Sequence, residues 1–347
     1  MSAVVDWRFA ATAGARLVAP GPALSPAAAA AEVASIRRAA LAAQAPVAQT
    51  ARLHTPHHAP PAIVVDRATW IGANAESMGG LLEPALASVV AARAQALHPA
   101  VTRAGARATG LEVGAMLAFL AGKVLGQYDL APQGEPRLLL VAPNIVQTAT
   151  QLDVDPADFR LWVCLHEETH RVQFTAVPWL RQHLIERSRA LAASLTPDQQ
   201  ALAGLARQLV QRLPEVLGDG GPGLVDLVTT SEQRDAIAEL TAVMSLLEGH
   251  ADVVMDDVGP AHVPSVALIR RRFTMRRQGA GLADRMLRRL LGLDAKMRQY
   301  ADGARFVRAV QSVVGVDGFN AVWTSPQTLP RPDEIVEPQR WVARVHG

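Results

Sequence analysis

The amino-acid sequence predicts a mainly α-helical fold with one small β element before a helix that carries a metal-binding motif. Half of the 347 residues are apolar and aromatic residues make up only 4%; together with abundant alanine, leucine and arginine, this composition favours helices. Apolar residues recur at helical spacing in long segments such as Ser231–Asp257. One apolar run between prolines, Arg137–Val141, reads instead as a strand.

Several of the expected helices have recognisable starts. Ser25 and Asp155 are placed to cap helices, and each is followed by a proline at the first helical position. Residues 1–25 read as an irregular arm around Trp7, and Gly218–Gly223 as a flexible loop. The helices expected along the chain cover residues 25–43, 70–97 (with a break at Pro84), 111–125, 156–174, 179–195, 197–213, 231–256, 282–291 and 302–314.

The motif His166-Glu167-Glu168-Thr169-His170 lies in an apolar, helix-like segment. In a helix, residues four apart share a face, so His166 and His170 could bind one zinc ion. Glu167 lies about 100° round the helix from His166. It could therefore stand beside the metal without binding it, as a general base for water must. The competing interpretation is an exposed polar face or a pair of buried, hydrogen-bonded histidines.

A third ligand is expected from a second helix. The metzincin pattern would need Gly and His where the chain has Gln173 and Ala176, so that pattern is excluded. Glu248 and Asp252 are four apart on the segment 231–256 and would face the same way. This spacing resembles that of gluzincins such as the thermolysin-like peptidases. Glu248 would then bind zinc, and Asp252 would accept a hydrogen bond from a ligand histidine and so orient its ring, without binding the metal itself.

Two neighbouring residues fit the metal less well. His250 would point away from a helix face that carries Glu248, because two residues correspond to about 200°. Cys164 has the same offset from His166 and reads as a small buried residue. The tract around His54, His57 and His58 is spaced by prolines and reads as an exposed loop rather than a metal site.

Composition and charge restrict the class of protein. One cysteine argues against a disulfide framework. No apolar leader run follows the first residues, and no run approaches about 18 consecutive apolar residues, so we expect a cytoplasmic protein without a membrane partner. The net charge is only +2, yet the segment 270–289 is strongly basic. It could be a solvated or helix-packing face, or a surface for an anionic partner; no nucleic-acid motif accompanies it.

Motifs along nearly the whole chain resemble an actinobacterial family of zincin-like metallopeptidases that is grouped as a domain of unknown function. One branch of that family is associated with coenzyme F420 biosynthesis. The motifs are DWRFA near the start, VVDRATWIGAN (64–74), LGQYD (125–129), HEETHRVQFTAVPWL (166–180), LEGHADVVMD (247–256) and KMRQYADGARFV (296–307).

The resemblance implies a mainly α-helical zincin-like fold and a hydrolase with zinc. We expect a single domain over residues 1–347, with an irregular arm plus a helix in 1–61 and a catalytic core in 62–347. The ligands would come from helices near 156–174 and 231–256. In zincins a strand edge before the metal helix lines the substrate groove, which gives Arg137–Val141 that role. Alternatively, this strand is buried and touches no substrate.

The function expected from these residues is that of a gluzincin-type zinc metallopeptidase. Glu167 would be the general base, and Tyr300 is the first candidate for the donor that stabilises an oxyanion, with Arg305 and His250 as others. A peptide or protein is the expected substrate, although another amide or an ester fits the same residues. The alternative function is a non-catalytic zinc-containing scaffold that works through the basic segment 270–289. The sequence specifies neither a natural substrate nor an oligomeric state.

Overall fold

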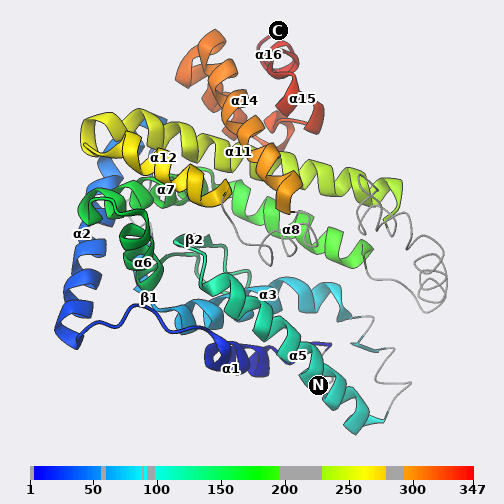
Figure 1. Cartoon of the computed structure of the whole chain (residues 1–347). Coiled ribbons are helices and arrows are strands. Elements are labelled where there is room, and N and C mark those ends of the chain that lie inside the picture. Colours follow the sequence, from blue (N-terminus) through cyan, green and yellow to red (C-terminus); the bar gives the residue numbers. More distant parts are fainter. Residues whose placement is uncertain (1–3, 56–59, 88–89, 92–97, 196–228, 279–292) are drawn as a thin grey trace. The chain divides into compact units, whose positions relative to one another are not determined.

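The computed structural model describes residues 4–55, 60–87, 90–91, 98–195, 229–278 and 293–347, with only the backbone for 277–278 and 293–301 (Figure 1). The expected helices at 197–213 and 282–291 and the glycine-rich loop Gly218–Gly223 lie outside these ranges, as do His57 and His58. Helices dominate the described chain and a three-stranded sheet accompanies them. The predicted fold class is confirmed. None of the described helices combines the length and the apolar character needed to cross a bilayer.

The chain forms two compact units, one of residues 1–185 with 250–278 and the other of residues 186–249 with 279–347. The division falls within helix α11 (Ser231–His262), so this helix runs through both units. The expectation of a single domain stays a prediction.

The helices of the first unit follow the sequence signals closely at their starts. Ser25 caps α2 and Asp155 caps α7, each through a side-chain oxygen that accepts a backbone N–H. These helices are α1 (Trp7–Leu17), α2 (Pro26–Ala51), α3 (Arg67–Ala85), α5 (Pro99–Ala121), α6 (Ala142–Leu152), α7 (Pro156–Ala176) and α12 (Val266–Gln278), with the first part of α8 (Pro178–Ser194).

The predicted strand Arg137–Val141 is present as β3, but its predicted place at a sheet edge is wrong. The sheet has the order β1-β3-β2, with β1 (Ala62–Val65) parallel to β3 and β2 (Gly126–Asp129) antiparallel to it. The central strand is β3, and Leu138 to Val141 are almost completely buried. A strand buried on both faces reads as a continuous apolar run, which is why β3 was visible in the sequence. The edge strand β1 is a shorter apolar run of four residues, and β2, with the sequence GQYD, has no such run.

The irregular arm predicted at the N-terminus is also wrong, because residues 7–17 form α1. Asp6 caps this helix, and its Oδ1 accepts the N–H of Phe9 at 2.9 Å. Only small residues of α1 are buried, and α1 crosses α5 closely at Gly114, where a Cβ would lie 2.6 Å from the carbonyl oxygen of Ala10. A helix that buries alanine and glycine lacks the pattern of large apolar residues by which a helix is recognised.

Helix α7, which carries the motif, is largely buried. Phe159, Val163 and Leu165 are almost completely buried, and α2 packs along this helix (Figure 1). Near its start, the carboxylate of Asp158 accepts the backbone N–H of Ser265 at 2.8 Å and its hydroxyl at 2.6 Å. The helix that carries the motif is therefore held rigidly on several sides.

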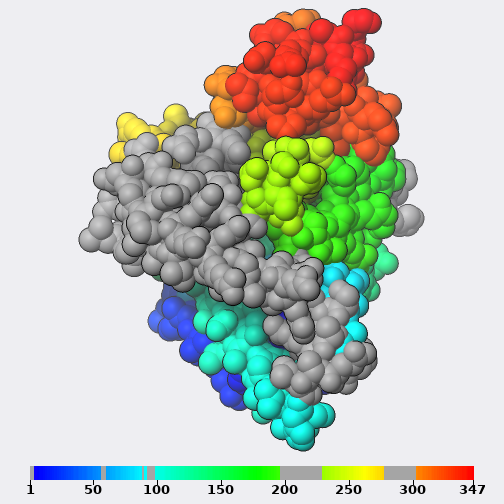
Figure 2. Space-filling model, turned by 90° about the vertical axis from the view of Figure 1, so that its right-hand side faces the viewer, coloured from blue at the N-terminus to red at the C-terminus, as the bar shows by residue number. Residues whose placement is uncertain are grey.

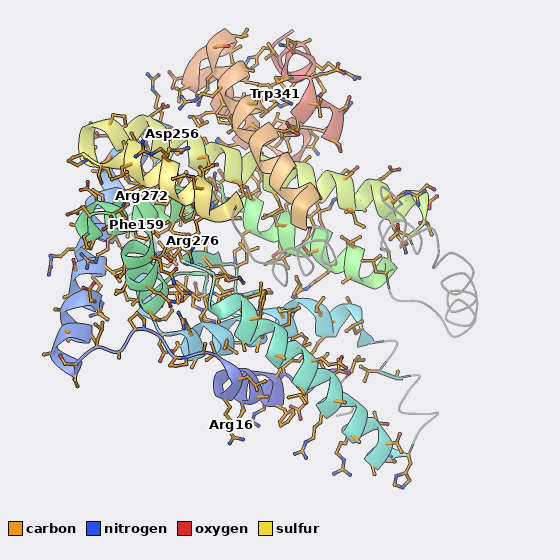
Figure 3. All side chains as sticks on the ribbon, in the orientation of Figure 1. Arg16, Phe159, Asp256, Arg272, Arg276 and Trp341 are labelled. Carbon is orange, nitrogen blue, oxygen red and sulfur yellow. The ribbon has the colours of Figure 1, made fainter. Side chains whose placement is uncertain are left out.

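The described part of the basic segment packs against neighbouring elements. Arg270 pairs with Asp256 of α11, and Arg272 donates to the carbonyl of Leu152 at 2.7 Å and pairs with Asp153. Arg276 donates to Thr148 Oγ1 at 2.9 Å; Arg272, Arg276 and Asp256 are labelled in Figure 3. These contacts support the helix-packing interpretation for residues 270–276.

In the second unit, the C-terminal elements pack on one another. They are α14 (Leu293–Phe319), the 3₁₀ turns Asn320–Trp323 and Pro326–Thr328, α15 (Pro332–Val336) and α16 (Pro338–His346), orange to red in Figure 2. Trp341 of α16 is fully buried, lies edge-on to Phe306 and donates its Nε1–H to the carbonyl of Thr328 at 2.8 Å (Figure 3). Arg344 forms a two-pronged ion pair with the buried Glu334.

Candidate metal centre

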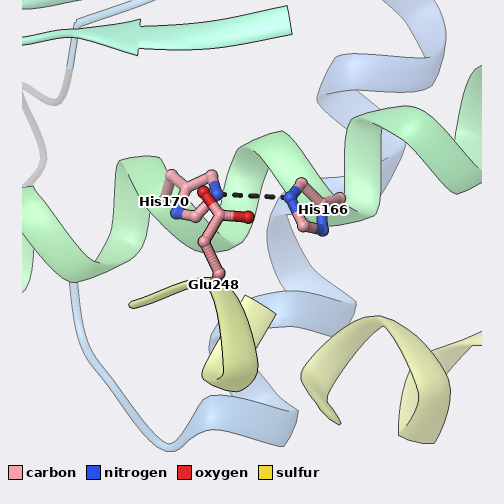
Figure 4. Close-up of side chains that lie close together, drawn as sticks. All are labelled: His166, His170 and Glu248. Carbon is pink, nitrogen blue, oxygen red and sulfur yellow. Dashed lines mark hydrogen bonds between the residues drawn. The ribbon is translucent and has the colours of Figure 1, made fainter. Parts of the chain in front are cut away.

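Helix α7 directs His166 and His170 toward one point. Their Nε2 atoms lie 3.2 Å apart and their rings are nearly perpendicular, with centroids at 4.9 Å (Figure 4). This follows from the four-residue spacing, which places both side chains on one face of the helix. The geometry is that of two imidazoles able to share an ion.

Glu248 completes the donor set. Ring nitrogens of the two histidines and a carboxylate oxygen of Glu248 all lie within 4.8 Å of one another (Figure 4). Glu248 stands on α11, and continuous helical backbone joins it to His250 and Asp252 of the first unit. Two imidazoles and one carboxylate are a donor set that zinc takes in catalytic sites, where it keeps a fourth position for water. The residues therefore fit a zinc ion.

Asp252 lies beside His166. Its Oδ1 is 3.7 Å from His166 Nδ1, which is longer than a hydrogen bond but within the range of an ion pair. One turn of α11 separates Asp252 from Glu248, so the same helix face presents both carboxylates. The role of Asp252 in orienting a ligand histidine stays a prediction, and the histidine in question is His166.

The partner of the other histidine is Gln173, which was not predicted. Its Oε1 lies 3.0 Å from His170 Nδ1, and its Nε2 lies 3.0 Å from Nδ1 of His250. Both Gln173 and His250 are fully buried. The three-residue spacing from His170 to Gln173 was an available signal. His250 is not part of the donor set, but it is linked to His170 through Gln173.

Glu167 is buried and lies directly against strand β2. A Cβ placed on Gly126 would be 2.5 Å from Cδ of Glu167 and 2.6 Å from its Cγ. Two residues on, Tyr128 stacks on Phe174 with ring centroids 5.0 Å apart. Alternate residues of β2 thus face α7, and a glycine allows the strand backbone to approach the carboxylate that is expected to act as a base.

A pocket of about 220 Å³ opens beside His166 and Glu167. Its apolar wall includes Met255 and the aromatic pair Trp162 and Phe273, whose rings meet edge to face at 5.1 Å. Lys123 and Arg270 also line it, and Asp252 does so from α11. The pocket is therefore apolar in part, with charges of both signs at its wall.

The sequence profile of the zincin-like metallopeptidase family matches residues 5–342. The chain belongs to this family. A solved structure from Chloroflexus aurantiacus, described as a "putative hydrolase with a novel fold", is similar over 99% of both chains, with 29% sequence identity and a TM-score of 0.69. A search of the curated proteins finds no match.

In this member of the family, Glu168 lies two residues beyond His166 on α7, about 200° round the helix, and is not part of the donor set. It forms a buried, two-pronged ion pair with Arg171, with Nε–Oε2 at 2.7 Å and Nη2–Oε1 at 2.5 Å. Burial raises the pKa of Glu168, and the hydrogen bond and charge of Arg171 lower it in part. Glu168 therefore forms a structural ion pair with Arg171 and is not needed as a metal ligand or base.

Arg171→Met is expected to destabilise the protein by about 3–5 kcal/mol, because it leaves the carboxylate of Glu168 buried without a partner. The double variant Glu168→Gln with Arg171→Met should recover most of that loss, since no buried charge remains. Denaturant unfolding of the two variants beside wild type measures both effects. Equal stability of the single and double variants would contradict the role given to the pair.

Three other residues were named from the sequence: Tyr300, Arg305 and Cys164. Tyr300 is in α14, but its side chain is not among those that the structure describes. Arg305 pairs with Asp302 of its own helix at 2.9 Å. Cys164 is buried, as predicted, and burial raises the pKa of its thiol, followed by the charges of Glu167 and Glu168.

Gly126→Ala is expected to reduce activity with little effect on zinc binding, because the new methyl group would occupy space now taken by the side chain of Glu167. We expect a fall in kcat of about 10²-fold, since a misplaced catalytic group costs rate at that scale. Gly134→Ala is the matched control, because a Cβ there meets only Ala131 Cβ, at 3.9 Å. Equal kcat values for Gly126→Ala and wild type would show that the contact is irrelevant to catalysis.

Proposed function

We propose that this zincin-like metallopeptidase is a zinc-dependent hydrolase of the gluzincin type, with a peptide or protein as its substrate. The observation that carries the proposal is the convergence of His166, His170 and Glu248, with Glu167 adjacent in the motif. A purely structural zinc site needs a fourth protein ligand and no base. Three ligands and a neighbouring carboxylate match a catalytic site instead.

The chain's own residues would share the chemistry as follows. Zinc, when bound, supplies a Lewis acid that acidifies a water molecule and polarises the scissile carbonyl. Glu167 would accept a proton from the attacking water and deliver it to the leaving nitrogen. The backbone at Gly126 covers one side of this carboxylate and limits its movement. Tyr300 remains the proposed donor to the oxyanion.

Strand β2 and the pocket support a peptide as the proposed substrate. Strand β2 pairs with β3 along one side and is an edge strand of the described sheet. An extended peptide could add to that edge by main-chain hydrogen bonds, next to Glu167. The adjacent pocket, with Trp162, Phe273 and Met255 in its wall, would then accept a large apolar side chain beside the scissile bond.

Two further parts of the proposal rest on sequence. The association with coenzyme F420 biosynthesis comes from the family resemblance, and the cytoplasmic location is the one expected from the sequence. The scaffold alternative has less support, because Arg270, Arg272 and Arg276 of the basic segment are engaged within the chain. A non-catalytic scaffold would also leave the carboxylate of Glu167 without a functional role.

A peptide-library digest analysed by mass spectrometry tests this function. We expect cleavage by the zinc-loaded protein, with large apolar residues enriched on one side of the cut, and no cleavage after removal of zinc with 1,10-phenanthroline. Readdition of zinc should restore it. Trp162→Ala should broaden or shift the preference while zinc content is kept. A zinc-loaded protein that cleaves no peptide, amide or ester would overturn the hydrolase proposal.

A further inference from the structure

A chain of three side chains extends from the half-buried His170 of the candidate metal centre to Gln173 and His250 in the core. His170 Nδ1 lies 3.0 Å from Gln173 Oε1, and Gln173 Nε2 lies 3.0 Å from His250 Nδ1. Gln173 and His250 are each 0% exposed. Buried polar groups are almost always paired, so both contacts are expected to be hydrogen bonds with defined donors and acceptors.

The amide of Gln173 has one acceptor atom and one donor atom at opposite positions. With Oε1 toward His170, that histidine must carry its proton on Nδ1, and its Nε2 is left as a lone pair. This Nε2 is the atom that faces Nε2 of His166. If the amide were turned over, His170 would accept at Nδ1 and carry its proton on Nε2, where it could not bind a metal.

His250 is the second partner of the amide. As the amide lies in the structure, the Nε2–H of Gln173 donates to Nδ1 of His250, so this ring carries its own proton on Nε2. With a partner on each side, the amide is held in the orientation that places its Oε1 against His170.

We propose that Gln173 and His250 are positioning residues that hold His170 in the tautomer whose Nε2 can bind the metal. We call the three side chains His170, Gln173 and His250 the relay. The inference rests on the proposed zinc site and deepens it. Ligand histidines commonly donate their second N–H to a carboxylate or a carbonyl; here a neutral amide takes that place, and the amide is itself held by a histidine.

The relay also joins the two helices of the site. Helix α11 carries both Glu248, which would bind the metal, and His250, two residues later, which fixes the partner of His170 on α7. The neighbour of His166 is different: its Nδ1 lies 3.7 Å from Oδ1 of the Asp252 carboxylate. The two ligand histidines therefore have a charged and a neutral partner, which limits the negative charge gathered around the metal.

The first test is zinc affinity, measured by competition with a chromogenic chelator. Gln173→Leu removes both hydrogen bonds and is expected to weaken zinc binding by about 10–100-fold, the usual cost of losing such a partner. Gln173→Glu keeps an acceptor for His170, and His250 can donate to it after a change of tautomer; this variant should bind zinc at least as tightly as wild type. His250→Phe leaves the amide free to turn and should weaken binding less than Gln173→Leu.

Thr169→Val is the matched control for a change in the buried part of α7. Thr169 is fully buried and its hydroxyl bonds only to the carbonyl of Leu165 on the same helix, at 2.9 Å. A general loss of packing would weaken zinc binding in this control and in Gln173→Leu alike, and Gln173→Glu would then rescue nothing. That result would overturn the proposal.

The second test uses the metal-free protein and so does not depend on zinc. Nitrogen-15 NMR of labelled histidine side chains reports which ring nitrogen carries the proton. We expect His170 to be protonated at Nδ1 in wild type, and at Nε2 or in exchange between both nitrogens in Gln173→Leu. An unchanged His170 tautomer in Gln173→Leu would contradict the relay.

The two tests separate this inference from the proposed function. A wild-type protein that binds zinc tightly, with a Gln173→Leu variant that binds it equally well, would overturn the relay and leave the hydrolase proposal standing. A wild-type protein that binds no zinc but shows the Nδ1 tautomer of His170, lost in Gln173→Leu, would support the relay as a positioning device and overturn the zinc hydrolase.

Discussion

Glu167→Gln is expected to lower kcat/KM by about 10²–10⁴-fold, the usual contribution of a general base, while zinc content stays unchanged. The amide has nearly the shape of the carboxylate but cannot accept a proton from water. Glu167 is buried against Gly126, so the isosteric change should leave the local packing intact. Steady-state kinetics on a peptide found in the library digest, together with metal analysis of the same samples, measures both quantities.

Glu168→Gln is the matched control, because it makes the same chemical change one residue further along α7. Its side chain bonds to Arg171 rather than facing the donor set. We expect this control to retain activity per folded molecule. If Glu167→Gln remained as active as Glu168→Gln, Glu167 would not be the base, and the gluzincin mechanism would fail with it.

Glu248→Ala is expected to weaken zinc binding by more than about 100-fold, because it removes a ligand rather than a partner of a ligand. In wild type, zinc at about 100 times its dissociation constant should stabilise the folded state by about 2.7 kcal/mol. That stabilisation should be absent in the variant at the same zinc concentration. Thermal unfolding with and without added zinc checks the prediction.

Asp257→Ala provides the control for Glu248→Ala, since Asp257 is an exposed acid on the same helix. We expect the control to gain stability from zinc as wild type does. An equal zinc-dependent gain in Glu248→Ala would mean that the third ligand has been assigned to the wrong residue.

The donor set could be predicted from the sequence because it depends on local helix geometry. The spacings of His166 to His170 and of Glu248 to Asp252 are one helical turn each, and one turn fixes a shared face. The pairing of the two helices came from the gluzincin spacing rather than from either helix alone. The structure brings His166, His170 and Glu248 together.

Features that depend on contacts between distant segments could not be predicted in this way. Gln173 is bonded to His250, 77 positions further along the chain, and its importance appears only when α7 and α11 are placed side by side. From the sequence, only the direction of His250 on its own helix can be predicted, and that direction says nothing of its contact with Gln173. Strand β2 was missed because four residues, Gly126–Asp129, carry too little pattern, although its glycine is what brings the backbone against Glu167.

The prediction of the N-terminus failed for a different physical reason. Helix α1 buries Ala10, Ala13 and Gly14, so its stability comes from close backbone packing on α5 rather than from a stripe of large apolar side chains. Such a helix lacks the large apolar side chains by which a core-facing helix is usually recognised. In contrast, Ser25 and Asp155 were correct helix caps because a cap depends on one side chain and its own backbone.

The most direct test of the central claim is an anomalous difference map from crystals of the zinc-loaded protein, with data collected on both sides of the zinc absorption edge. We expect one strong peak per chain within about 2.0–2.2 Å of His166 Nε2, His170 Nε2 and a carboxylate oxygen of Glu248. The peak should vanish on the low-energy side of the edge. A peak at other side chains, or fully zinc-loaded crystals with no peak at these three residues, would contradict the account.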